Sequence, residues 1–376
     1  GDEREGYGTT EDGYDADVGV VNSCRVREKA EHELMSLRGR RRPLKEGKAH
    51  LTIAVAGCVA QREGERLLSR SDLVDLVLGP DNIPELPELL RLQQGGAPPS
   101  VRTEFDLLDP QFLVARPRGI GREVTAFVTV MKGCDERCTF CIVPTTRGAE
   151  RYRPADEILE EISGLAAGGV REVTLLGQTV NSWFDPSEAD HKPTSRTAPS
   201  GSRFALLLRR IAEEVPGLAR LRYTSPHPRH LTPELIAAHG DLEILPRHVH
   251  LPVQSGSDAV LRRMSRRYTS AEYLERVRAL QAAAPGLTLS TDLIVGFPGE
   301  TDADFEELCE FVRTSRFERM GVFRYSDEED TAAFDYGDKV PRELARERHR
   351  ELMGIQREIM TEQLEASVGS EDTVLV

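Results

Sequence analysis

The sequence predicts an α/β protein with two parts, a partial parallel-sheet domain followed by a partial (β/α)6 barrel. Short apolar runs alternate with charged helical segments in residues 15–92, and six further strand and helix pairs follow residue 123. Small, polar or cysteine residues come directly after these runs. Continuously apolar strands are typical of parallel sheets covered on both faces, and ligands bind at the carboxyl ends of such strands.

The amino-terminal domain is predicted over residues 1–92. Its apolar runs are Val18–Asn22, Leu51–Ala56 and Val74–Leu78. We expect a helix from Glu28 to about Gly39 and a second one after Cys58. Cys24 and Cys58 follow the first two strands, which places them at the ligand-binding edge of the sheet. Residues 93–123 have the Gly and Pro density of a linker.

The barrel domain is predicted over residues 124–366. Its strands are expected near residues 124–131, 172–176, 219–224, 248–251, 288–295 and 320–325. Helices are expected between them, at residues 154–167, 205–215, 270–283, 301–314 and 342–365. The distinctive polar and cysteine segments all follow strands, so they would meet at one carboxyl rim, where barrel enzymes keep their active sites. This convergence indicates an enzyme.

Composition excludes two classes of protein. No apolar run approaches the roughly 20 residues that span a bilayer, which excludes a membrane-spanning protein. Six cysteines in 376 residues, with no signal-like opening segment, do not form the disulfide framework of a small secreted domain. The thiols are therefore expected to be reduced, in the cytoplasm. The net charge of −14 gives no global support for nucleic-acid binding, although local Arg clusters are present.

The most informative segment is the loop with three cysteines, Cys134, Cys138 and Cys141. Structural zinc prefers paired Cys-x2-Cys or Cys/His knuckles, and no fourth Cys or His lies within a few residues. A 4Fe-4S cluster normally takes four cysteines, so three leave one iron without a protein ligand. An open iron of this kind can chelate an amino acid and reduce a bound sulfonium, which would release a 5′-deoxyadenosyl radical.

This loop, with the aromatic Phe140 before its last thiol, resembles the radical S-adenosylmethionine (SAM) superfamily. Further segments are similar to the methylthiotransferases within it, namely Asn22–Ala30, Ala56–Gly64, Leu175–Asn181, His250–Ser257 and Ile294–Thr301. The chain is thus identified as a member of the radical SAM methylthiotransferase family, with its closest likeness to those that modify isopentenyl-adenosine in tRNA. The resemblance implies a flavodoxin-like first domain and a radical SAM barrel.

The resemblance also implies roles for residues. Cys134, Cys138 and Cys141 would ligate the catalytic 4Fe-4S cluster, with SAM on its free iron. Cofactor contacts would come from Phe140, Gly177, Gln178, Gln254, Ser255 and Gly296, and substrate contacts from Asn181, Arg147, Arg151 and Arg153. Cys24 and Cys58 would belong to a second 4Fe-4S cluster.

Two features at the ends of the chain depart from the family. The second cluster takes a third cysteine that is missing here, so either a preceding segment is absent or this chain cannot hold that cluster. Residues 367–376 resemble only the start of a small RNA-binding β-barrel, the TRAM domain, and absence of the rest would explain the acidic charge. Cys309, on a predicted helix, is expected in the core.

The implied reaction adds a methylthio group to position 2 of N6-isopentenyl-adenosine next to the tRNA anticodon. An electron donor such as flavodoxin or ferredoxin and a sulfur donor would be partners. Three alternatives remain open. These are methylthiolation of an aspartate in ribosomal protein S12, favoured by the segment Ser326–Glu329, methylthiolation of threonylcarbamoyl-adenosine in tRNA, and a non-catalytic Fe-S or zinc RNA-binding role.

Overall fold

The computed structural model describes residues 7–10, 15–23, 45, 48, 51–106, 110–114, 123–188 and 202–371. The chain divides into two compact units. The first comprises Gly1–Leu113 with Val143–Ala149, and the second comprises Val114–Ile142 with Glu150–Val376. Each unit has its own sheet and core.

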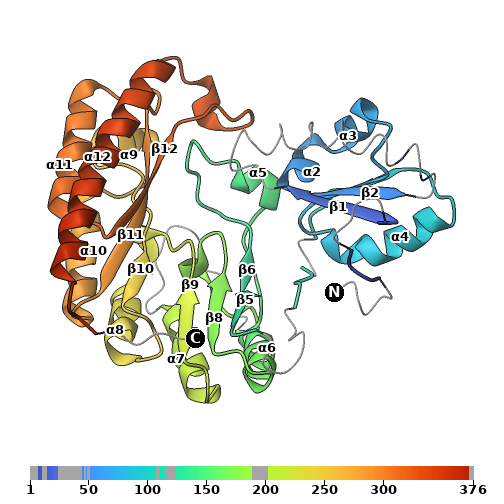
Figure 1. The fold of residues 1–376 in the computed structure, drawn as a ribbon, viewed down its shortest axis with the longest axis horizontal. Helices are drawn as coiled ribbons and strands as arrows, with labels where there is room; N and C mark the ends of the chain where they lie inside the picture. The colour runs from blue at the N-terminus through green and yellow to red at the C-terminus, as the bar shows by residue number, and fades with distance from the viewer. Residues whose placement is uncertain are drawn as a thin grey trace. The chain divides into compact units, whose positions relative to one another are not determined.

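The first unit contains a four-stranded parallel sheet in the order β1-β2-β3-β4 (Figure 1). Its strands are β1 (Val18–Ser23), β2 (Thr52–Gly57), β3 (Leu76–Leu78) and β4 (Ser100–Arg102). Alternate residues of β2 pack in opposite directions. Ala54 and Ala56 join a core with α4 (Leu86–Gln94), whereas Val55 packs with residues of α2 (Cys58–Glu63) and α3 (Glu65–Arg70). The sheet is therefore covered on both faces, as its apolar strands predict.

The three predicted strands of this unit are confirmed, and β4 is an addition to them. β4 lies inside residues 93–123, the range expected to be a linker, and it pairs with β3. Its three residues are too few to form a recognisable apolar run, so the Gly and Pro residues around it dominate the pattern. The helix expected from Glu28 and the predicted cluster ligand Cys24 lie outside the described residues.

The second unit contains the six predicted strands in two parallel three-stranded sheets. The first sheet has the order β5-β8-β9 and the second has the order β10-β11-β12 (Figure 1). The strands are β5 (Thr125–Thr129), β8 (Glu172–Leu176), β9 (Arg220–Tyr223), β10 (His248–His250), β11 (Thr288–Val295) and β12 (Arg319–Arg324). No ladder of strand pairs joins β9 to β10 in the described part of the chain. The barrel is thus open as well as partial.

Helices cover one side of these sheets and enclose the core. They are α6 (Ala155–Ala167), α7 (Arg203–Glu214), α8 (Pro233–Asp241), α9 (Asp258–Arg263), α10 (Ser270–Ala283), α11 (Asp302–Ser315) and α12 (Arg342–Ala366). Along β11 every second residue is buried, beginning with Leu289, because only one face of the strand meets the helices. Thr269 and Thr301 start α10 and α11 with capping boxes.

A short antiparallel ribbon was not expected from the sequence. It pairs β6 (Met131–Lys132) with β7 (Arg151–Tyr152). Between its strands lie the loop with the three cysteines and α5 (Val143–Arg147). The ribbon therefore closes the base of the segment that carries the thiols.

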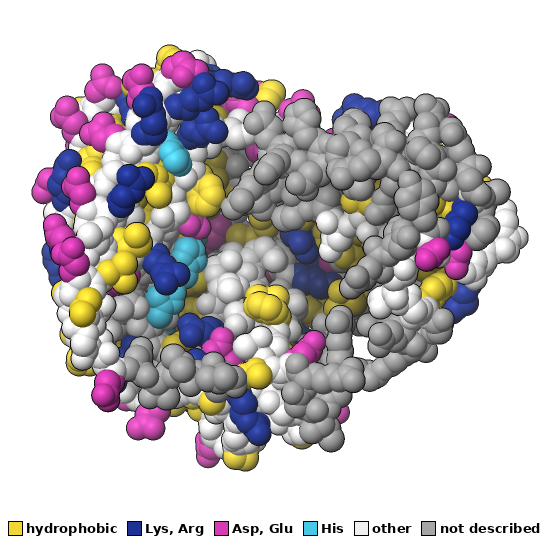
Figure 2. Space-filling model, in the orientation of Figure 1, with side chains coloured by type: hydrophobic (Ala, Val, Ile, Leu, Met, Phe, Trp, Pro, Cys, Tyr) yellow, Lys and Arg dark blue, Asp and Glu magenta, His cyan; other side chains and the backbone are white. Residues whose placement is uncertain are grey.

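At the carboxyl end, α12 finishes at Ala366 and Ser367–Ser370 form a hydrogen-bonded turn. Residues 372–376, half of the predicted start of a TRAM domain, lie outside the described residues. No helix among those described is long and apolar enough to cross a bilayer. Acidic and basic side chains alternate over the visible face of the second unit rather than separating into two surfaces (Figure 2).

Candidate cluster and cofactor site

The three thiols of the loop lie between β6 and α5 in the chain, and each is partly exposed. The loop leaves β6 through Gly133, whose φ of 78° lies in the left-handed region that glycine adopts without strain. The backbone N–H of Cys141 donates to the carbonyl of Cys138 at 3.0 Å. This hydrogen bond closes a turn between the last two cysteines, so one short segment carries all three thiols.

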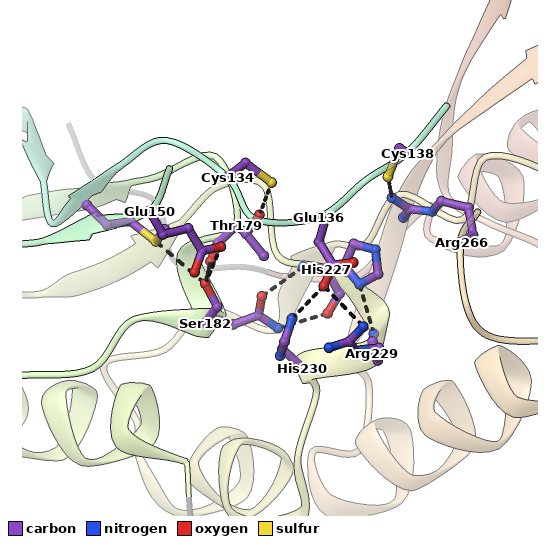
Figure 3. Close-up of polar contacts among 12 residues, drawn as sticks. Cys134, Glu136, Cys138, Glu150, Thr179, Ser182, His227, Arg229, His230 and Arg266 are labelled. Carbon is purple, nitrogen blue, oxygen red and sulfur yellow. Dashed lines mark hydrogen bonds and ion pairs between the residues drawn. The ribbon is translucent and has the colours of Figure 1, made fainter. Parts of the chain in front are cut away.

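Neutral and acidic groups surround the Cys134 end of the loop (Figure 3). Its Sγ lies 2.9 Å from Oγ1 of Thr179, which follows β8. Burial raises the pKa of the Cys134 thiol to about 12, and the carboxyl of Glu150 acts in the same direction. These surroundings therefore favour the neutral thiol of Cys134 over its thiolate. A bound iron would reverse this preference, because metal ions bind the thiolate form.

The Cys138 end of the loop meets a buried cation. Nη1 of Arg266 donates to Sγ of Cys138 at 3.4 Å (Figure 3). The neighbouring residue Thr139 fixes the loop by donating its N–H to the carbonyl of Met264 at 3.1 Å and its hydroxyl to the carbonyl of Arg263 at 2.9 Å. The carbonyl of Thr139 accepts from the N–H of Ala333 at 2.8 Å. The segment after α9 therefore positions this end.

Glu136, between the two cysteines, braces the middle of the loop against η4 (Pro228–His230). One carboxylate oxygen lies 3.0 Å from Nε2 of His230 and 3.5 Å from Nη1 of Arg229. Burial acts to raise the pKa of Glu136, but the hydrogen bond from His230 and the charge of Arg229 lower it overall. The buried carboxylate is therefore ionised and holds the loop in place (Figure 3).

Glu136, His227 and His230 have ligand atoms within 4.8 Å of one another, as a metal site would. However, Nδ1 of His227 accepts the N–H of Arg229 at 3.2 Å, which leaves the ring proton on Nε2, the nitrogen that would face a metal. Arg229 also places a positive charge beside the carboxylate. The hydrogen bonds and the ion pair of these side chains suit a structural role better than the binding of a metal cation.

The predicted cofactor-binding residues lie at strand ends, with different surroundings. Gln178 is half-buried after β8, and its Oε1 has no partner among the described residues. Gln254 adopts a φ of 76°, and its backbone bridges to β11. Ser255 is buried and its hydroxyl accepts the N–H of Ser257 at 3.2 Å, so it shapes the loop after β10.

The aromatic and glycine positions predicted to touch the cofactor also make close contacts within the protein. Phe140 packs against an apolar cluster that contains Phe297. A Cβ on Gly177 would lie 2.6 Å from the side chain of Met131. A Cβ on Gly296 would lie 2.6 Å from Cβ of Ala345, at a φ of 73°. These contacts explain the residue types without a cofactor.

Two predicted substrate contacts require correction. Asn181 is 5% exposed, and both ends of its amide bind the backbone of His227, at 3.0 and 2.8 Å. Arg153 is 3% exposed and forms a buried ion pair with Glu161. Because these groups are already engaged, they hold the framework rather than contact a substrate. Asn181 was predicted from the segment that follows the second barrel strand, and Arg153 from its position just after the cysteine loop. Neither observation carries information about the partners of these side chains.

The remaining predicted residues have simpler placements. Arg151 is buried in β7, and Arg147 is half-buried at the end of α5. Cys58 is buried directly after β2, at the carboxyl edge where the sequence predicts it. Cys309 is 3% exposed in the core of the second unit, which confirms its predicted structural role.

The surroundings of the loop fit the implied cluster. The loop offers three soft thiol ligands, the donors that iron–sulfur clusters take. Arg266 is 6% exposed, and no carboxylate lies within ion-pair distance of it among the described residues. A thiolate-bound cluster would supply the missing negative charge. Sequence reasoning missed Arg266, Thr179 and Glu136, since each becomes significant only through partners distant in the chain.

Comparison with protein families supports this assignment. Residues 128–312 match the Radical SAM superfamily and residues 3–79 match the uncharacterized protein family UPF0004. The chain is 56% identical to a tRNA-2-methylthio-N(6)-dimethylallyladenosine synthase of Sorangium cellulosum, across 99% of this chain and 76% of the relative. A synthase with the same name from Acidithiobacillus ferrooxidans is 45% identical, across 96% of this chain and 78% of the relative.

Solved structures show the same fold at low sequence identity. The radical SAM methyltransferase TsrM from Kitasatospora setae, with cobalamin and a [4Fe-4S] cluster bound, matches with a TM-score of 0.57 and 15% identity. That match covers 84% of this chain and 63% of TsrM. Together with the cysteine loop and the relatives that match nearly the whole of this chain, these results assign the chain to the family of tRNA-2-methylthio-N(6)-dimethylallyladenosine synthases, which are radical SAM methylthiotransferases.

Proposed function

We propose that the protein adds a methylthio group to carbon 2 of an N6-dimethylallyl-adenosine next to the anticodon of tRNA. One observation carries this proposal. Two relatives with that named activity are 56% and 45% identical to this chain over nearly its whole length. Identity at this level extends through both units, which favours a shared substrate as well as a shared cofactor.

In this proposal Cys134, Cys138 and Cys141 hold the catalytic 4Fe-4S cluster and leave one iron for SAM. The bound cluster and SAM supply a 5′-deoxyadenosyl radical, which abstracts hydrogen from carbon positions that acid–base groups cannot activate. The chain's own contribution is to orient the thiols, through Thr179 at one end and Arg266 at the other. Gln178 is proposed to contact the cofactor, because its buried Oε1 has no other partner among the described residues.

The inserted sulfur is proposed to come from a second cluster held in part by Cys24 and Cys58. The burial of Cys58 at the carboxyl edge of a parallel sheet supports this role. A sulfur donor would restore that cluster, and a low-potential protein such as flavodoxin or ferredoxin would supply electrons. These partners and the substrate tRNA place the reaction in the cytoplasm.

The adenine must leave its stack before carbon 2 can reach the carboxyl rim of the barrel. Enzymes that modify bases flip the nucleotide into the site, and single-stranded loops make this step inexpensive. Arg147 is proposed to contact phosphate, since it lies at the end of α5 just beyond the cysteine loop. Arg153 is excluded from that role by its buried ion pair.

The first test is mass spectrometry of nucleosides from tRNA of cells that lack this gene. We expect the 2-methylthio nucleoside to disappear and its dimethylallyl precursor to accumulate. Return of the methylthio nucleoside on complementation would be the positive control. If the nucleoside persists in cells with no second enzyme of this kind, the proposed substrate is wrong.

A second test separates the other methylthiotransferase activities. Reconstituted protein is incubated with SAM and dithionite and with one of three substrates, tRNA carrying dimethylallyl-adenosine, tRNA carrying threonylcarbamoyl-adenosine, or ribosomal protein S12. We expect a methylthio product only with the first. Formation of 5′-deoxyadenosine without any product would support the radical chemistry and reject all three substrates, and its absence from protein with an intact cluster would favour a non-catalytic RNA-binding role.

A further inference from the structure

Arg266 is held in one orientation by all three of its donor nitrogens. Nε donates to the hydroxyl of Tyr268 at 2.9 Å, Nη2 donates to the carbonyl of Pro252 at 2.8 Å, and Nη1 donates to Sγ of Cys138 at 3.4 Å. The Tyr268 hydroxyl in turn donates to the carbonyl of Val253 at 2.8 Å. The guanidinium is therefore fixed by the loop after β10 before any ligand arrives, and it points one N–H at the thiol.

The charge of this group has no acidic partner within the described part of the chain. Its hydrogen-bond partners are the neutral phenol of Tyr268, the backbone carbonyl of Pro252 and the sulfur of Cys138. Burial raises the pKa of the Tyr268 hydroxyl, so the phenol stays uncharged. A buried cation without a counter-ion is strongly destabilising. The one atom in this set that can become negative is Cys138 Sγ.

We propose that Arg266 is a positioning and tuning residue for the catalytic cluster, which raises its reduction potential through a buried N–H···S contact to Cys138. A 4Fe-4S cluster held by three thiolates carries a net negative charge, and one-electron reduction makes it more negative. Net charge, hydrogen bonds to sulfur and solvent exposure set the potential of such clusters. A fixed, buried cation stabilises the reduced form more than the oxidised form.

This arrangement addresses a specific difficulty of the reaction. The cluster must accept one electron from an external low-potential donor and then pass it to SAM. Without a nearby positive charge, the reduction potential of the cluster would be lower, and that donor would reduce the cluster less readily. At the opposite end of the loop, Sγ of Cys134 contacts the neutral Thr179 hydroxyl, and the Glu150 carboxyl raises the pKa of the Cys134 thiol.

The test is a redox titration of the whole reconstituted protein, followed by electron paramagnetic resonance, with dithionite as the one-electron reductant and no tRNA present. The signal that changes when SAM is added identifies the cluster that binds SAM. In Arg266→Gln we expect the ratio of reduced to oxidised cluster at a fixed potential to fall about tenfold, which is a midpoint shift of about 59 mV for one electron. A midpoint unchanged or raised would overturn the proposal.

Arg267→Gln is the matched control, because it removes the same charge from the adjacent, exposed residue. Solvent screens an exposed charge, so its midpoint should stay close to that of the unaltered protein. If both variants shift equally, general surface charge and not the Cys138 contact sets the potential. Iron content, measured in each variant, establishes that the same number of clusters is being compared.

Two milder variants keep the proposal testable if Arg266→Gln does not hold a cluster. Arg266→Lys retains the charge but lacks the planar guanidinium that reaches three acceptors at once. Tyr268→Phe keeps Arg266 but removes the hydroxyl that orients it. Both should lower the midpoint below that of the unaltered protein, because each disturbs the N–H···S contact to Cys138, and unchanged midpoints in both would reject the role of that contact. Because no RNA is used, this outcome is independent of the proposed substrate.

Discussion

The two ends of the cysteine loop are anchored in different ways. The Cys134 end follows the β6-β7 ribbon and meets Thr179, 45 residues away in the sequence. The Cys138 end is held by Arg263 and Arg266, which lie 124 and 128 residues beyond their partners. The first anchor uses the sheet β5-β8-β9, and the second uses segments that follow β10 and β12.

This difference indicates that the loop is completed only when both halves of the barrel are folded. A local ribbon can form early, because its loop closure costs little entropy. The contacts of Thr139 and Arg266 require segments more than a hundred residues away. The Cys138 end should therefore respond to changes in either half of the barrel, whereas the Cys134 end should respond chiefly to changes in the first half.

The largest expected effect is loss of a thiol at either end. Cys134→Ala and Cys138→Ala should each lose the iron of the catalytic cluster and reduce 5′-deoxyadenosine formation to background, because two thiolates do not hold a 4Fe-4S cluster stably. Iron analysis and chromatography of SAM cleavage products check this. Cys309→Ala, which removes a core thiol, should keep its iron. A full iron content in either loop variant would show that the cluster lies elsewhere.

The next effect concerns the framework beneath the Cys134 end. Glu161→Ala leaves the buried Arg153 without its main partner, and breaking a buried pair costs about 3–5 kcal/mol in unfolding free energy. The control is Glu157→Ala, because Glu157 contacts the same guanidinium from an exposed position and should cost less than about 1 kcal/mol. Urea denaturation measures both. Equal losses would mean that the buried pair contributes no more than the exposed one.

Acid should weaken the first half of the barrel through His239. Burial lowers the pKa of this side chain to about 4, and its Nε2 lies 2.6 Å from the hydroxyl of Tyr223 on β9. Since the unfolded chain binds the proton more tightly, stability falls as pH drops from about 6.5 towards 4, at up to about 1.4 kcal/mol per pH unit. His239→Gln should remove this part of the slope. If the unfolding free energies of the unaltered protein and of His239→Gln depend on pH in the same way, His239 is not the group responsible.

The smallest effect is expected at Thr179. Thr179→Val removes the hydroxyl beside Cys134 and should change unfolding free energy by about 1 kcal/mol. It should shift the cluster midpoint less than Arg266→Gln does, because it removes a neutral group and not a charge. Thr179→Ser keeps the hydroxyl and serves as the control. A shift as large as that of Arg266→Gln would show that the two ends of the loop are electrostatically equivalent.

Strands and helices could be predicted well where the apolar pattern is long and local. The strand expected at residues 288–295 is β11 with the same bounds, and the helix expected at residues 270–283 is α10. Both patterns arise from residues a few positions apart, which sequence periodicity reports directly. The strand β4 and the β6-β7 ribbon escaped prediction because three and two residues per strand contain no period.

For the candidate cluster site, the sequence alone indicated the cysteine ligands but not the residues that position them. The spacing of Cys134, Cys138 and Cys141 indicates an iron–sulfur cluster without any tertiary information. The partners of Asn181 and Arg153 depend on which buried groups the fold brings to them, and Arg266 looks like one member of an arginine cluster until Cys138 is placed beside it. Charge and polarity in a sequence do not distinguish a solvent-facing group from a buried brace.

Since no ladder joins β9 to β10 among the described strands, the cysteine loop also affects how the two three-stranded sheets are connected. The cysteine loop contacts Thr179, which follows β8 of one sheet, and Arg263, which follows β10 of the other. The loop therefore links the two sheets across the boundary between β9 and β10, here called the seam. A ligand that binds only when the two sheets are linked by the loop stabilises that arrangement. Assembly of the cluster and packing of the two sheets therefore favour each other. Oxidative damage to the iron would then loosen the scaffold itself, and backbone amides along the seam should exchange with deuterium faster in metal-free protein.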